Sequence, residues 1–108
     1  MAEKILDLFE HMSVTPDNVI YMIIFKACTQ LANERSVATG KKLLNQISNE
    51  LPMNIDLSNS ALHMLVRFSD IQGAERVFRS IKDKNVVTYG IMMQGNDLSY
   101  QLHLQILI

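Results

Sequence analysis

Hydrophobic positions along this chain recur with the spacing of helices rather than strands. Residues 70–90 show the pattern most clearly, because apolar residues three and four apart share one helical face at Ile71, Ala74, Val77, Phe78 and Ile81. A polar break at 82–85 follows, and a second apolar helical pattern starts at Val86 and continues through Tyr89 and Met93. Neither helix could bury its apolar stripe alone, so the pattern predicts helices that pack as pairs.

The same alternation of helix and break extends over the rest of the chain. We expect further helices at 2–12, 19–31, from about Ser36 to a point before Pro52, at 55–68, at 71–82 and at 86–94, with a short final helix from 97 onward. Pro16 falls in a break, where proline is tolerated. The helix at 19–31 is apolar on most sides, which indicates a helix sandwiched between neighbours.

Polar residues before several of these segments are candidate helix caps. We expect Ser36 to cap the third helix, after a polar connection at 32–35, and Ser69 or Asp70 to cap the helix that follows them. Asn85 precedes the last apolar pattern and fits a turn residue or an N-cap.

Four apolar positions recur at a spacing near 35 residues. The three sets are Ile5, Leu8, Phe9 and Met12; Gly40, Leu43, Leu44 and Ile47; and Ala74, Val77, Phe78 and Ile81, at offsets of 35 and 34. The helices between these sets align at Tyr21, Ser58 and Tyr89, which are 37 and 31 residues apart. A period of this length that contains two helices predicts an all-α solenoid, in which stacked antiparallel helix pairs share one core.

Composition fits one small helical domain and excludes several classes of protein. The chain has 108 residues, 48% of them hydrophobic, with two prolines and four glycines, too few for a loop-rich β fold. Its one cysteine, Cys28, excludes a disulfide framework and a self-contained zinc site and is expected in the core. The net charge of −1 does not by itself favour nucleic-acid binding.

No arrangement typical of an enzyme or a cofactor site is present in the sequence. His11, His63 and His103 lie far apart and have no cysteine or carboxylate at ligand spacing, and no Gly-rich phosphate loop or triad-like set occurs. We therefore expect no catalytic activity and no cofactor. No apolar run is long enough to span a bilayer, and residues 1–12 match neither a signal peptide nor a transit peptide.

Several short segments resemble the pentatricopeptide repeat family. Residues 85–89 (NVVTY) and 15–21 (TPDNVIY) are similar to the junction that opens each motif, whereas the Trp, Leu-Gly and Tyr pattern of tetratricopeptide repeats is absent. Residues 69–78 (SDIQGAERVF) resemble the second helix of a short motif, and 26–28 (KAC) with 40–43 (GKKL) resemble a long one. The resemblance covers about 2–96 and implies a right-handed stack of helix pairs.

The resemblance also divides the chain into motifs. It implies one domain with a half motif at 1–17, a long motif at 18–54, a short motif at 55–85 and a truncated motif at 86–108, whose pattern is lost after Asn96. This alternation is similar to the organellar subclass associated with RNA editing and processing. The chain is thus expected in a mitochondrion or another organelle, as a fragment or a shortened relative of a longer array.

Single-stranded RNA is the partner that the resemblance implies, with one base contacted per motif. In the short motif the base-contacting residues would be Asn59 and Asn85, a pair that favours a pyrimidine in the family. The long motif places Met22 and Asn54 there, and the last motif offers Gly90. The positions that pack against a base are Val19, Asp56 and Val87, of which charged Asp56 departs from the apolar residue usual in the family.

Other interpretations stay open from the sequence. Asn59 could be a solvated surface amide, and the chain could be a protein-interaction scaffold whose concave face binds a peptide or another subunit. Eleven acidic against ten basic residues, Asp56 and Met22 favour this scaffold. The apolar segment 102–108 would offer a further contact for a partner. A chain this short could also bind no ligand.

Overall fold

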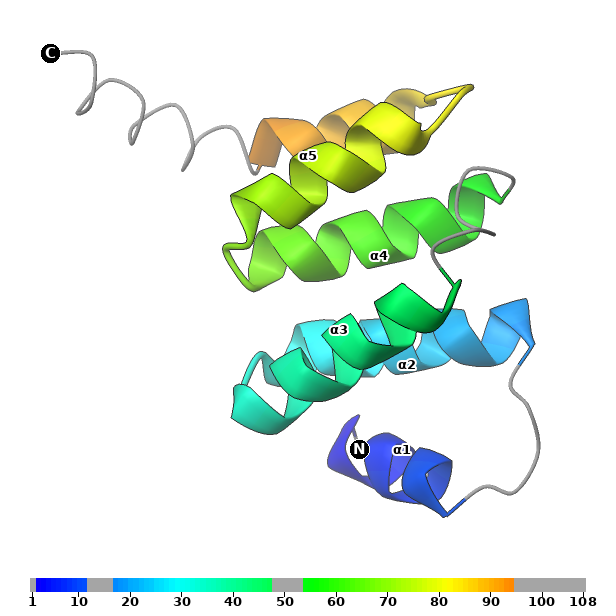
Figure 1. Ribbon diagram of the computed structural model, residues 1–108, viewed down its shortest axis with the longest axis vertical. Coiled ribbons are helices and arrows are strands. Elements are labelled where there is room, and N and C mark those ends of the chain that lie inside the picture. Colours follow the sequence, from blue (N-terminus) through cyan, green and yellow to red (C-terminus); the bar gives the residue numbers. More distant parts are fainter. Residues whose placement is uncertain (1, 12–16, 48–53, 95–108) are drawn as a thin grey trace, which may run out of the picture.

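The computed structural model describes residues 2–11, 17–47 and 54–94, and its regular elements there are all helices (Figure 1). They are α1 (Ala2–Glu10), α2 (Asn18–Leu31), α3 (Glu34–Ile47), α4 (Ile55–Arg67), α5 (Ile71–Ser80) and a further helical segment at 86–94. The all-α prediction is confirmed. The expected final helix, the apolar segment 102–108, Met12, Pro16 and Pro52 lie outside the described residues.

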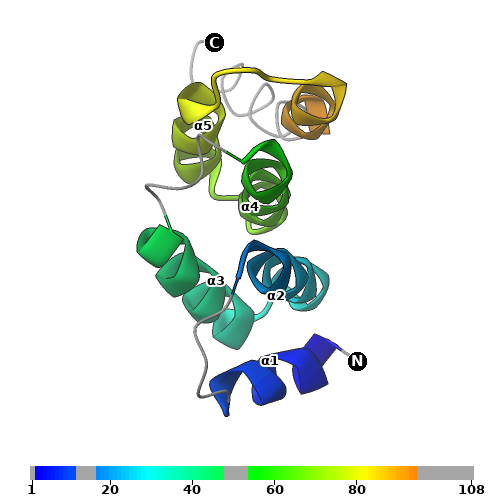
Figure 2. The same ribbon diagram turned by 90° about the vertical axis from the view of Figure 1, so that its right-hand side faces the viewer.

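The helices form a stack of hairpins with two sides. In Figure 2, α2, α4 and the helix at 86–94 lie along one side of the stack, and α3 and α5 lie along the other. We call the former the first helices, and α1, α3 and α5 the second helices. Helix α2 packs against α1, α3 and α4, and α4 also packs against α5. Each hairpin therefore covers apolar surface of its neighbour, as a repeat architecture requires.

The core is centred on the first helices. Ile24 and Phe25 of α2 and Leu62 and Leu65 of α4 are at most 1% exposed. The prediction that the helix near 19–31 is sandwiched is confirmed, since α2 has neighbours on three sides. Cys28 is buried in the same core, as expected, and burial raises the pKa of its thiol to about 11.

The junctions before the first helices share one geometry. Asp17, Asn54 and Asn85 each accept a hydrogen bond through a side-chain oxygen from the amide three residues later, at 2.9, 3.0 and 3.0 Å. Their carbonyl oxygens accept hydrogen bonds from the amides of Tyr21, Ser58 and Tyr89 at 3.0, 2.9 and 3.2 Å. Tyr21, Ser58 and Tyr89 therefore occupy equivalent points in successive hairpins, as their spacing predicts, and Asn85 is an N-cap.

Helix α3 begins earlier than its sequence suggests. The prediction that Ser36 is its N-cap is wrong, because Asn33 takes this role and its Oδ1 accepts a hydrogen bond from the Ser36 amide at 2.9 Å. The Ser36 hydroxyl in turn accepts from the Asn33 amide at 2.8 Å, which completes a capping box around a buried serine. Ala32 takes the left-handed conformation with φ of 48°, so two residues suffice for the connection predicted at 32–35.

The apolar face of α1 also differs from the predicted stripe. Leu8 is 68% exposed, whereas Leu6, which was not assigned to the stripe, is fully buried, and Ile5 and Phe9 are partly buried. Among the labelled helices, the main neighbour of α1 is α2, which belongs to the next hairpin, whereas α3 packs against α2 within its own hairpin. Among the described residues, the side of α1 that faces α2 is therefore the one with the fully buried residue, Leu6.

The helix at 86–94 presents a different face from the one that its apolar residues predict. Val86, Tyr89 and Met93 are 85%, 52% and 67% exposed, while polar Thr88 is fully buried. Tyr89 still contacts the ring of Phe78 edge-on, with centroids 5.7 Å apart. The buried face is set by packing against the preceding hairpin, and it includes a hydroxyl that hydropathy alone would place outside.

A glycine allows α3 to approach α4 closely. A Cβ atom on Gly40 would lie 2.6 Å from the Sδ atom of Met64, which is fully buried in α4. Asp70, the confirmed N-cap of α5, accepts a hydrogen bond from the Gly73 amide at 3.0 Å and forms an ion pair with Lys41 of α3 at 3.3 Å. Burial alone would raise the pKa of the Asp70 carboxyl, but these two contacts outweigh it and lower the pKa.

Candidate nucleic-acid interface

The first helices lie along one side of the stack (Figure 2), and the second residue of each is exposed. Val19 and Val87, the positions predicted to pack against a base, are 58% and 53% exposed. Asp56 occupies the equivalent position in α4, the first helix between those of Val19 and Val87, and its carboxylate is also exposed. The structure thus leaves all three positions open to a ligand, and one of them carries a negative charge.

Two open clefts separate the first helices. The larger, of about 420 Å³, lies between α2 and α4 and is lined by Val19, Met22, Ile23, Lys26, Thr29, Gln30, Ser60 and His63. The smaller, of about 210 Å³, lies between α4 and the helix at 86–94 and includes Arg67 and Gln94. His63 borders both clefts, so they adjoin each other across α4.

Asn59 and Asn85 meet at the junction between α4 and the next helix. The Nδ2 atom of Asn59 donates a hydrogen bond to Oδ1 of Asn85 at 3.3 Å, although the two residues are 26 apart in sequence. The hydroxyl of Thr88 lies 2.7 Å from Oδ1 of Asn59 and 3.0 Å from Oδ1 of Asn85. These three side chains form one polar cluster, which we call the junction cluster.

The junction cluster decides between two interpretations of Asn59 in the free protein. Asn59 is only 7% exposed and its amide is hydrogen-bonded on both sides, so it is not a solvated surface residue. Asn85 is exposed. The pair lies together as a shared base contact would require, and its role in binding stays a prediction.

The other predicted contact residues are placed less favourably. Met22 is half-buried beside the larger cleft, and Asn54 caps α4 through the Leu57 amide. Gly90 is exposed, and a Cβ atom there would meet nothing within 4 Å. At Met22 the structure therefore has an apolar side chain where α4 carries the Asn59 amide, and at Gly90 it has open space.

Positive charges lie in the later turns of the first helices. Lys26 and Arg67 are exposed and line the larger and the smaller cleft, respectively. Within the part of the chain that the structure describes, neither forms an ion pair. Sequence reasoning did not single them out, although Lys26 lies seven residues after Val19 and so shares its helical face.

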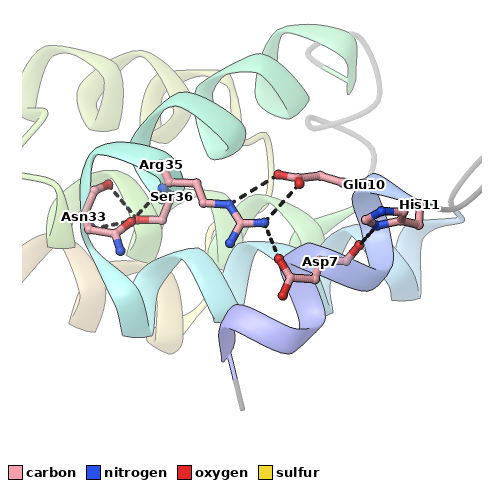
Figure 3. A network of polar contacts seen from close by, with 6 residues as sticks. All are labelled: Asp7, Glu10, His11, Asn33, Arg35 and Ser36. Atoms are coloured by element: carbon pink, nitrogen blue, oxygen red, sulfur yellow. Dashed lines mark hydrogen bonds and ion pairs between the residues drawn. The ribbon is translucent and has the colours of Figure 1, made fainter.

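Three cations of the second helices, Arg35, Lys41 and Arg79, form ion pairs. Arg35 of α3 contacts Asp7 and Glu10 of α1 at 2.6 and 3.0 Å, as Figure 3 shows. These two hydrogen-bonded carboxylates raise the pKa of the Arg35 guanidinium above its ordinary value. Lys41 pairs with Asp70 in the same way. Among the described residues, Lys26 and Arg67 on the first helices stay available to an anionic ligand, as do the exposed Lys42 and Arg76 on the second helices.

Among residues 2–11, 17–47 and 54–94, no group of three or more His, Cys, Asp or Glu residues is arranged to hold a metal ion. No helix in these ranges combines the length and apolarity needed to cross a bilayer.

The curated proteins that are similar to this chain are all described as pentatricopeptide repeat-containing proteins. A chloroplastic pentatricopeptide repeat-containing protein of Arabidopsis thaliana is 31% identical over 100 residues, which is 88% of this chain and 11% of that protein. A mitochondrial one from the same plant is 29% identical over 98 residues, covering 87% of this chain and 14% of the relative. The chain therefore spans only a small part of the length of these relatives.

Similarity over most of this chain, to several proteins of one description, agrees with the helical hairpins and with the junction geometry. These similarities support a relationship of this chain to the pentatricopeptide repeat family. No family model and no solved structure matches the chain. The pentatricopeptide-like hairpins nevertheless repeat within this one chain, with α2–α3 and α4–α5 as the two complete pairs among the described residues.

Proposed function

We propose that this chain is a helical-repeat module that binds single-stranded RNA along the first-helix side of the stack. The observation that carries the proposal is the junction cluster, where Nδ2 of Asn59 and Oδ1 of Asn85, from successive hairpins, lie 3.3 Å apart. Side-chain amides can hydrogen-bond the edges of unpaired bases, as repeat proteins of this kind do with one base per repeat.

Two further features of the same side fit such a ligand. Exposed Val19 and Val87 offer apolar surface against which bases can pack, and packing of this kind is tolerant of sequence. Lys26 and Arg67 offer cations for phosphate groups, the main source of affinity in nucleic-acid binding. Asp56 opposes them, so we expect weak binding from this chain alone.

Within this proposal each motif has its own role. The short motif at 55–85 binds one pyrimidine through Asn59 and Asn85, while the long motif at 18–54, with Met22 and Asn54, contributes little base selectivity. The truncated motif at 86–108 supplies Val87 and, through Gly90, space without a reading side chain. The half motif at 1–17 contributes α1, which packs against α2.

The biological setting is also proposed from similarity. The long and short alternation resembles the organellar subclass, and the names of the relatives mention chloroplasts and mitochondria. We therefore infer a role in organellar RNA processing or editing, with the chemistry supplied by another protein and not by this chain.

A titration against short single-stranded RNA at 50 and 200 mM salt tests the proposed function. If two to three phosphates are neutralised, affinity should fall by about tenfold between the two salts, because counterion release makes RNA binding salt-dependent. Fluorescence anisotropy of labelled octamers measures this, with a duplex of the same sequence as control. Absence of RNA binding, or preferred salt-insensitive binding to an apolar peptide, would favour the scaffold instead.

A further inference from the structure

Thr88 occupies the centre of the junction cluster and is fully buried. Its hydroxyl lies 2.7 Å from Oδ1 of Asn59, and its backbone amide donates to Oδ1 of Asn85 at 3.0 Å. The backbone amide of Asn85 in turn donates a hydrogen bond to the Thr88 hydroxyl at 3.3 Å. A single residue of the next hairpin thus contacts the side chains of both predicted base-contacting residues.

These contacts determine the orientation of the side-chain carboxamides of Asn59 and Asn85. A hydroxyl has one proton, and the shortest contact of Thr88 assigns that proton to Oδ1 of Asn59. Oδ1 of Asn85 is occupied by the Thr88 amide and by Nδ2 of Asn59. Oδ1 of Asn85 thus accepts two hydrogen bonds and Oδ1 of Asn59 is turned toward Thr88, so the side of the pair that faces away from Thr88 carries N–H donors.

The preceding junction provides an internal comparison. There the residue equivalent to Thr88 is Leu57, which is fully buried, and the residue equivalent to Asn59 is Met22. Asn54 caps its helix as Asn85 does, but among the described residues no side-chain hydroxyl or second carboxamide is hydrogen-bonded to its side chain. Among the junctions described, the buried hydroxyl occurs where the preceding first helix carries an amide.

We propose that Thr88 is a positioning residue for base selectivity: it holds Asn59 and Asn85 so that they present N–H donors to the hydrogen-bond acceptors of an RNA base. The inference rests on the proposed function, because it concerns how the same site selects its base. It also means that selectivity in the motif at 55–85 depends on a side chain from the following hairpin.

Two substitutions separate the hydroxyl from the shape of the side chain. Thr88→Val keeps the volume and removes the hydroxyl, so Asn59 loses the contact that orients its carboxamide, and Asn85, which Asn59 contacts through Nδ2, loses that support indirectly. Thr88→Ser keeps the hydroxyl and removes only a methyl group. If the valine variant fails to fold by circular dichroism, Thr88→Ala provides the same comparison with less crowding.

The experiment is an NMR titration of the full 108-residue chain, labelled with ¹⁵N, against hexamers of U, C, A and G. We expect the unmodified chain to favour the pyrimidine hexamers. We expect Thr88→Val to reduce the ratio of pyrimidine to purine affinity by about threefold to tenfold, which is the range for one or two lost hydrogen bonds. Thr88→Ser should keep this ratio.

An unchanged ratio in Thr88→Val, or an equal loss in Thr88→Ser, would overturn the positioning role. A second readout needs no RNA: the side-chain NH₂ signals of Asn59 and Asn85 should shift in the valine variant and stay in place in the serine variant. Unshifted signals in the valine variant would also overturn the role. If the unmodified chain binds no hexamer, the proposed function fails, and these amide signals still decide whether Thr88 positions the pair.

Discussion

Replacement of Ile24 by alanine should lower the free energy of unfolding by about 2–5 kcal/mol, the range for large aliphatic residues cut back in a core. Ile24 is 1% exposed in α2, which packs against α1, α3 and α4. The cavity would therefore open where hairpins meet, and the surrounding helices could close it only in part. Total stabilities of small domains are about 5–15 kcal/mol, so this loss would be a large share.

Ile23→Ala is the matched control for Ile24→Ala. Ile23 is the adjacent residue on the same helix, has the same side chain, and is 47% exposed beside the larger cleft. We expect a loss below about 1 kcal/mol, since a half-exposed side chain gives up less burial and leaves no closed cavity. Urea unfolding followed by circular dichroism compares the two variants, and equal losses would contradict the packing described for α2.

Reversal of both charges at Lys26 and Arg67 should reduce the affinity for single-stranded RNA by tenfold or more at low salt. These two cations line the clefts and form no ion pair within the described ranges, so they are available to phosphates. Lys26→Glu with Arg67→Glu would remove two such contacts and add repulsion. The measurement is the anisotropy titration at 50 mM salt.

A second double variant controls for net charge. Lys42→Glu with Arg76→Glu changes the charge of the chain by the same amount, but both residues are exposed on second helices, α3 and α5. We expect this variant to lose much less affinity than the first one. Similar losses in both would show that total charge, and not the first-helix side, governs binding.

Helical periodicity was sufficient to predict most of the fold. The spacing of apolar residues placed α4 at 55–68 against an observed Ile55–Arg67, and the equivalence of Tyr21, Ser58 and Tyr89 holds in the structure. These features follow from local geometry, because a repeated pattern of burial can arise only from a repeated packing of helices.

The wrong predictions concern which side of a helix its neighbours cover. In α1 either Leu6 or Leu8 could complete an apolar face, and only the position of α2 shows that Leu6 is buried. Similarly, Asn33 and Ser36 are both good caps, and the two-residue turn through Ala32 decides between them. Such choices depend on tertiary contacts and not on the period.

The candidate site was predictable in part. Family resemblance pointed to Asn59 and Asn85, and the structure places them in contact. It could not point to Thr88, whose hydroxyl matters only because residues 29 positions apart meet. The resemblance also gave no sign that Asn59 would be buried, which follows from the packing of the next hairpin over α4.

The account depends on the first helices forming one continuous RNA-binding side, and chemical-shift mapping tests this most directly. A titration of the ¹⁵N-labelled chain with a pyrimidine-rich octamer should shift the amides of Ile23 and His63, which line the clefts, and of exposed Val87. Amides of exposed second-helix residues such as Lys42 and Arg76 should not move. Shifts concentrated on α3 and α5, or no shifts at millimolar RNA, would contradict the account.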